Sequence, residues 1–236
     1  MGKFSCFFWA WSALCLSACS WDDVEGDGER VEKTRNLDAF DRVRTDCELS
    51  VQVTRGDAPS VVVSIDSNLQ HLVQTQVEDG VLDIQLDASV HDIVPGPHVR
   101  VTMPALAAAK QVGSGKLSVS LDAPEAPLDL FLSGSGDLRY QGRSAALGAY
   151  LSGSGEMRLA GGTRDVTLSL SGSGDLGGRG LMAESGTLDL SGSGEISATV
   201  TESVQVSLSG SGEIELYGGA EVDELHHSGS GDFERH

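Results

Sequence analysis

The sequence predicts an all-β protein in which a β-solenoid with coils of about 19 residues follows a β-rich N-terminal portion of the same domain. Three observations lead to this prediction. The triplet Gly-Ser-Gly occurs seven times between Gly113 and Gly231, and the copies begin 21, 19, 19, 20, 18 and 19 residues apart. Apolar and polar residues alternate on both sides of the triplets, as in strands with one buried face. The triplets hold 14 of the 30 glycines, so the glycine excess is periodic, which argues against a disordered linker.

The first segment, residues 1–18, is predicted to be a secretory signal that is removed from the mature protein. Lys3 supplies a basic start, and residues 4–16 form an apolar stretch that is too short to span a membrane. The sequence Leu-Ser-Ala-Cys that ends at Cys19 resembles the bacterial lipobox, whose cysteine is diacylated and becomes the first residue of the mature chain. An ordinary signal peptide with an incidental cysteine is the alternative, and we favour lipidation of Cys19.

Lipidation would make the membrane a partner of the chain, because two or three acyl chains such as palmitate anchor a protein durably. Ser20 stands where an aspartate would typify retention in the inner membrane, so the resemblance favours an outer-membrane lipoprotein. It leaves open whether the chain faces the periplasm or the cell surface. Residues 19–35 are acidic and rich in glycine, and they are predicted to form a flexible tether.

Residues 36–111 are predicted to form the β-rich N-terminal portion. Apolar residues alternate with polar ones from residue 49 to 54, and residues 61–65 are a run of mostly β-branched side chains. Gly, Asp and Pro separate such runs and mark the turns. Single helical turns are expected at residues 69–73 and 105–110.

The order of these segments is similar to the head GIN domain of putative auto-transporter adhesins, a secreted bacterial domain of unknown function. The segment Met103-Pro104-Ala105-Leu106 stands before the first Gly-Ser-Gly triplet, and together with the repeats behind it makes the resemblance specific. The likeness extends from about Asn36 to Asp232 through residues 36–43, 48–56, 68–69, 80–84, 101–106 and 113–115. It implies a right-handed parallel β-helix and a binding role, and it brings no catalytic residues with it.

Residues 112–236 are predicted to form the solenoid, with each Ser-Gly-Ser-Gly sequence at a corner of a coil. In the second copy, the even-numbered positions hold leucines, glycines and Tyr140, and most of the odd-numbered positions between them hold polar residues. We therefore expect the glycines to face inward, where no Cβ fits, and the serines to face solvent. The unbroken period of two suggests that strand geometry continues through the corner.

An acidic residue follows each triplet from the second copy onward, and stacking would place these residues in one column that begins at Lys116. The column comprises Asp137, Glu156, Asp175, Glu195, Glu213 and Asp232. One hypothesis is that Asp175, Glu195, Glu213 and Asp232 bind Ca²⁺, since this ion takes carboxylate oxygens as ligands. The alternative, which we favour, is a solvated column of charge that discourages edge pairing. No other metal or cofactor is expected.

No nucleophile elbow, Cys-His pair or His-Glu-x-x-His spacing occurs in the sequence. Adjacent residues of a strand face opposite sides, so His226 and His227 cannot chelate a metal on one face. Five arginines gather in coils two to four and would suit a polysaccharide lyase, although Asp137, Glu156 and Asp165 can simply pair with them. The arginines are Arg139, Arg143, Arg158, Arg164 and Arg179.

The sequence thus favours a non-catalytic, envelope-anchored solenoid that binds, adheres or assembles at the bacterial surface. Its partner would be an envelope protein or a polysaccharide. Nucleic acid is excluded as a partner, because the chain carries a net charge of −19 and has no basic stripe with interleaved aromatics. The alternatives are a carbohydrate-active β-helix enzyme and a structural protein that self-associates end to end.

Overall fold

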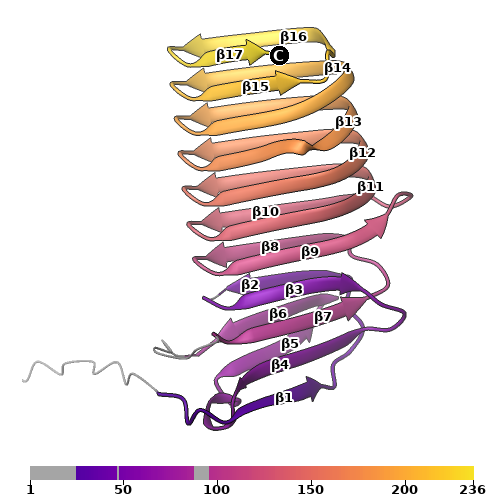
Figure 1. The fold of residues 1–236 in the computed structure, drawn as a ribbon, viewed down its shortest axis with the longest axis vertical. Coiled ribbons are helices and arrows are strands. Elements are labelled where there is room, and N and C mark those ends of the chain that lie inside the picture. Colours follow the sequence, from indigo (N-terminus) through magenta and orange to yellow (C-terminus); the bar gives the residue numbers. More distant parts are fainter. Residues whose placement is uncertain (1–24, 47, 88–95) are drawn as a thin grey trace, which may run out of the picture.

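The computed structural model describes residues 25–46, 48–87 and 96–236, which form a rod of stacked β-coils (Figure 1). The predicted signal, Cys19 and the start of the predicted tether lie outside these residues. The strands of the N-terminal portion are β1 (Arg30–Arg35), β2 (Arg42–Asp46), β3 (Ser50–Arg55), β4 (Ser60–Asp66), β5 (Val73–Glu78), β6 (Val81–Leu86) and β7 (His98–Met103). A single turn of 3₁₀ helix, η1 (Ser67–Leu69), separates β4 from β5.

The solenoid portion consists of ten strands in the described chain, and four of them run through almost a whole coil. They are β8 (Ala108–Gly113), β9 (Lys116–Ala123), β10 (Leu128–Gly134), β11 (Asp137–Gly153), β12 (Glu156–Gly172), β13 (Asp175–Gly192), β14 (Glu195–Gly210), β15 (Glu213–Tyr217), β16 (Glu221–Gly229) and β17 (Asp232–Arg235). All of the pairings between them are parallel, as expected when each coil stacks on the one before it. The predicted β-solenoid with coils of about 19 residues is confirmed.

Each coil contributes one segment to each of two parallel sheets. The N-terminal halves of β11 to β14 pair in one sheet with β9 and β15, which we call wall A. The C-terminal halves pair in the other with β10 and β16, which we call wall B. The long strands therefore bend once, and the Gly-Ser-Gly corners on the opposite side (left in Figure 1) close every coil.

Aliphatic side chains fill the space between the two walls, which confirms the predicted alternation. Leucines two residues before the corner glycine are buried in the second to sixth triplets, and so are the apolar residues two positions after the second glycine of these triplets. The first column comprises Leu132, Leu151, Leu170, Leu190 and Leu208, and the second Leu138, Met157, Leu176, Ile196 and Ile214. Since each side chain rests on the same position of the next coil, the core is continuous along the rod.

The corner glycines differ from the prediction that strand geometry passes through them. The first glycine of every triplet has a positive φ, between 90° and 133°, and the strand ends there. A Cβ on Gly172 would lie 2.3 Å from the carbonyl oxygen of Gly153 in the preceding coil. The first glycine is thus required by the turn and by stacking along the rod, whereas only the second, such as Gly174, is buried. The serine between them is exposed at each of the six later corners, as predicted.

The N-terminal portion continues the same two walls, but its coils do not stack in chain order. Strands β2 and β3 form a coil that lies between the coil of β6 and β7 and the coil of β8 and β9. Strand β4 pairs antiparallel with β7, and β5 pairs antiparallel with β6, so the parallel stack ends there. Residues 30–35, assigned above to the tether, form β1, which pairs with β4 because its extended backbone continues that sheet.

The two helical turns expected in this portion are misplaced. Residues 69–73 are preceded by η1 at Ser67–Leu69, and β5 already begins at Val73. Residues 108–110 belong to strand β8 rather than to a helical turn. The alanines there favour a helix locally, but pairing with β2 and β10 on both sides outweighs that preference.

Candidate functional site

The acidic column exists on wall A as the spacing predicts. Asp137 pairs in register with Glu156, and each later acid pairs with the next one up to Asp232. The first two members have basic partners: Lys116 Nζ lies 3.8 Å from Asp137, and Arg158 contacts Glu156. From Asp175 onward the same-face positions two residues later hold Gly, Ser and Glu, so the upper half of the column is uncompensated.

This uncompensated charge acts on Glu195, which lies in the middle of the upper half. Desolvation raises the pKa of Glu195 above its ordinary value, and the negative charges of Asp175, Glu215 and Glu213 raise it further. The carboxylate is therefore easier to protonate in the folded chain than in the unfolded chain. The electrostatic repulsion between neighbouring carboxylates of the column therefore increases as these groups ionise.

Substitution of Glu195 by Gln is expected to stabilise the fold at neutral pH by about 0.5 kcal/mol, a small effect because solvent screens exposed charges. A carboxyl group whose folded pKa is raised favours the fold below its unfolded pKa and loses this contribution as pH rises through the folded value. The advantage of Glu195→Gln should thus vanish below pH 4.5, the ordinary value of the group. Urea denaturation across this pH range measures it. Glu202→Gln, which removes an exposed carboxylate at the bend of the same strand, is the matched control variant.

A shallow groove of about 520 Å³ runs along the rod beside the acidic column. The exposed corner serines form one side of the groove and the carboxylates form the other, and the buried corner glycines form its floor. Asp175, Glu195, Glu213 and Asp232 all line it. The structure arranges these four in a row along the stack, and whether they bind Ca²⁺ stays a prediction.

A second groove, of about 630 Å³, crosses the outer face of wall A next to the column. Small residues on neighbouring strands form its floor, among them Ala160, Gly177 and Gly180, and they leave a hollow between the larger side chains around them. The pairing of β12 with β13 shifts between Arg158 and Ala160, which inserts an extra residue into β13 next to the exposed Arg179. We call this hollow, with Arg139, Arg158 and Arg179 at its rim, the arginine groove.

The three rim arginines face acidic side chains across the arginine groove. Glu156, Asp175 and Glu195 line the side nearest the acidic column. The guanidinium of Arg179 lies over the ring of Tyr217, with 4.3 Å from Cζ to the ring centroid. The groove thus offers planar cationic donors and carboxylate acceptors within one surface, which suits an extended ligand with charged and hydroxyl groups.

The remaining arginines of the predicted cluster lie in ion pairs away from the arginine groove. Arg143 donates to both oxygens of Asp122, at 2.8 and 2.6 Å, and this contact lowers the pKa of Asp122. Arg164 pairs with Asp165 at 3.5 Å. Two of the predicted acidic partners, Glu156 and Asp165, therefore do pair with arginine.

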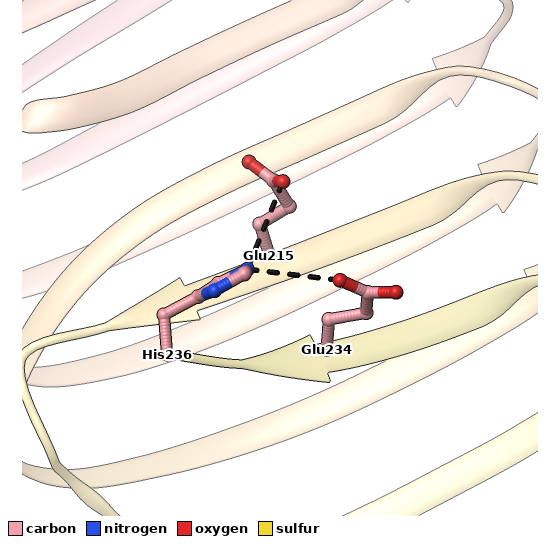
Figure 2. Close-up of side chains that lie close together, drawn as sticks. All are labelled: Glu215, Glu234 and His236. Atoms are coloured by element: carbon pink, nitrogen blue, oxygen red, sulfur yellow. Dashed lines mark ion pairs between the residues drawn. The ribbon is translucent and has the colours of Figure 1, made fainter.

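A further cluster escaped the sequence analysis. Glu215, Glu234 and His236 bring their carboxylate and imidazole groups together at the last two strands of wall A (Figure 2). The signal was available as Glu-x-His at residues 234–236, because residues two apart on a strand share a face.

Comparisons with known proteins identify relatives of the chain. A family model described as putative auto-transporter adhesin, head GIN domain, matches residues 39–220. A search of curated proteins finds no match. Among the described residues, no helix has the length and apolar character needed to cross a membrane.

Solved structures with the same fold come from species of Bacteroides and Parabacteroides. A putative adhesin from Bacteroides fragilis is 18% identical, with a TM-score of 0.77, and the match covers 90% of this chain and 98% of that one. A putative adhesin from Parabacteroides distasonis is 23% identical, with a TM-score of 0.68 and coverage of 91% and 100%. A structure described as a putative lipid binding protein from the same species is 21% identical, with a TM-score of 0.69 and coverage of 91% and 99%. At these identities, the likeness shows a shared fold.

Proposed function

Because the chain belongs to the putative auto-transporter adhesin head GIN domain family, we propose that it is a non-catalytic binding module of the bacterial envelope. In this proposal the arginine groove holds an extended ligand, such as an acidic polysaccharide or a surface protein segment. The observation that carries the proposal is the placement of Arg139, Arg158 and Arg179 around a shallow floor of small residues. Bidentate donors on a rigid sheet recognise carboxylate or sulfate groups without the closing loops that many enzymes use.

The groups around the arginine groove favour binding over lyase chemistry. A lyase needs a base that removes a proton beside a carboxylated carbon, and an arginine remains protonated in water. The side chain of Tyr140 is 2% exposed and lies in the core, and burial raises the pKa of its hydroxyl, so it supplies no base to the groove. Arg158, moreover, already contacts Glu156. The wall therefore supports recognition better than proton abstraction.

Anchoring is the second part of the proposal. We propose that Cys19 is lipidated and tethers the rod to the outer membrane, as the lipobox-like sequence indicates. The acidic column and the arginine groove stand on the coils of β11 to β15, several coils from β1, the first strand of the described chain (Figure 1). Mass spectrometry of the membrane fraction tests it, and an unmodified Cys19 in the mature chain would refute the anchor.

Replacement of all three rim arginines by Gln should weaken binding to polygalacturonate at least about tenfold, because each charge-assisted contact contributes more than about 1 kcal/mol. Biolayer interferometry on the immobilised polymer measures this, with neutral galactan as the control polymer. Arg164→Gln is the matched control variant, since Arg164 is exposed and pairs with Asp165 outside the groove. Equal loss in the control would contradict the site. Accumulation of unsaturated uronate products would overturn the non-catalytic assignment.

End-to-end assembly of two rods remains a further proposal, which the last coil supports. In the described chain β16 pairs with β14 and β17 with β15, so both strands present an open edge. Leu225 on β16 is 47% exposed, which is unusual for a leucine in this fold. A strictly monomeric protein in light scattering at high concentration would contradict this proposal.

A further inference from the structure

We propose that Glu215, Glu234 and His236 form a binding site for a divalent transition-metal ion, with Zn²⁺ as the ion that fits best. Figure 2 shows the imidazole of His236 between the two carboxylates, with dashed lines from the ring to each. One ligand atom from each residue lies within 4.8 Å of the other two. The site is separate from the arginine groove, and nothing in its geometry depends on the binding function proposed above.

The backbone of the last two wall A strands brings the three side chains together. Glu215 on β15 and Glu234 on β17 pair in register, so they are neighbours across the parallel ladder. The backbone N–H of His236 donates to the carbonyl of Leu216 at 2.9 Å, which extends the same ladder by one residue. His236 is two residues beyond Glu234, and the strand period of two therefore places it on the same face. Arg235 faces the other way and donates to Ala220.

The distances are close to those of a coordination sphere. Nε2 of His236 lies 3.8 Å from Oε1 of Glu215 and 3.7 Å from Oε2 of Glu234. Both separations are too long for hydrogen bonds. Ligands at about 2.0–2.1 Å from a tetrahedral Zn²⁺ stand about 3.4 Å apart, so shifts of a few tenths of an ångström would bring the imidazole nitrogen and each of the two oxygens to that separation.

The donor set favours a transition metal over the alkaline-earth ions. Ca²⁺ and Mg²⁺ prefer shells of oxygen ligands, whereas imidazole suits Zn²⁺, Ni²⁺ and Cu²⁺. One nitrogen and two carboxylate oxygens match catalytic or exchangeable zinc sites, which keep a fourth position for water or a partner group. The neighbouring acids of the column add negative potential that attracts a cation.

Contacts around the three ligands hold them in orientation before an ion binds. The ring of Tyr217 stacks on that of His236, with centroids 4.5 Å apart and planes 11° apart. The hydroxyl of Tyr217 donates to Oε2 of Glu215 at 3.1 Å, which leaves Oε1 turned toward the imidazole. Such outer contacts typically set the geometry and affinity of a metal site. Arg179 also lies over Tyr217, so one tyrosine ring connects this site with the rim of the arginine groove.

Isothermal titration of the full-length chain in detergent, without a polyhistidine tag, tests the site with Zn²⁺ alone. We expect one ion per chain, and binding at least about tenfold weaker for His236→Ala and for Glu234→Gln. His226→Ala is the matched control, because His226 is exposed and has its own partner, Glu224, at 2.8 Å. Circular dichroism should show that all variants remain folded, since the three ligands are not part of the core.

A second measurement separates the site from the acidic column. Co²⁺ should give the visible absorption of a low-coordinate nitrogen-oxygen site, Zn²⁺ should displace it, and an excess of Ca²⁺ should not. The absence of Zn²⁺ binding at millimolar ion would overturn the proposal. So would an equal loss of binding in His226→Ala, or displacement of Co²⁺ by Ca²⁺, which would assign the binding to the row of carboxylates.

Discussion

Substitution of Gly172 by Ala is expected to destabilise the solenoid by about 3–5 kcal/mol, a large fraction of the stability of an ordinary domain. Two effects combine at this position. The φ of Gly172 is +133°, a conformation that costs a residue with a Cβ about 1–3 kcal/mol. The new methyl group would also stand 2.3 Å from the carbonyl oxygen of Gly153, which is backbone and cannot move aside without shifting a whole coil.

Gly162→Ala is the matched control, because Gly162 lies on the same strand and has no positive φ. A Cβ there would meet its nearest atoms at 3.8 and 3.9 Å, which are ordinary contacts. Its effect should remain within about 0.5 kcal/mol, as for most surface substitutions. Urea denaturation followed by circular dichroism compares the two midpoints. Similar midpoints for both variants would show that the corner glycines are not required for stacking.

Substitution of Leu151 by Ala is expected to cost about 3 kcal/mol, the second-largest effect of a single change considered for this protein. Leu151 is 2% exposed and belongs to the leucine column before the corner. Its Cδ2 atom lies 2.8 Å from where a Cβ of Gly174 would be, so the side chain fills the space beneath the next corner. Removal of the side chain leaves a cavity that the stiff coils cannot close.

Met182→Ala is the control for Leu151→Ala, since Met182 is a large apolar residue that is 62% exposed. Its loss should change stability by less than about 0.5 kcal/mol. The same denaturation measurement compares both variants with the parent chain. A cost for Leu151→Ala no greater than that for Met182→Ala would mean that the column does not form the core.

The solenoid could be predicted from the sequence because its information is local and repeated. Every coil repeats the same alternation of apolar and polar residues, so the buried column through Leu132 and Leu151 follows from the spacing of the triplets alone. The position of the acidic column follows in the same way, since parallel coils place equivalent residues side by side. The chemistry of the corner was only half predicted. The repeat period shows that a glycine is needed at each corner. The positive φ of that glycine and the short distance to the carbonyl oxygen of the preceding coil are properties of the folded backbone, which the spacing does not reveal.

The N-terminal coils could not be predicted in the same manner. No fixed period links β2 and β3 to β6 and β7, and their order in the stack depends on long-range pairing that a single sequence does not encode visibly. The metal cluster falls between these cases. Glu234 and His236 share a face by their spacing, whereas their approach to Glu215 depends on the register of β15 with β17.

The out-of-order coil has a mechanical consequence. A pull on the chain through Arg30 would first act on β1, which among the described strands pairs with β4 alone and is further held by Arg30 with Asp66 and by Gln70 with Val31. The next strand, β2, is clamped between β6 and β8, so it cannot be drawn out without parting two ladders at once. Tension would thus detach the edge strand β1 first, and the inserted coil of β2 and β3 would then resist further unfolding of the rod.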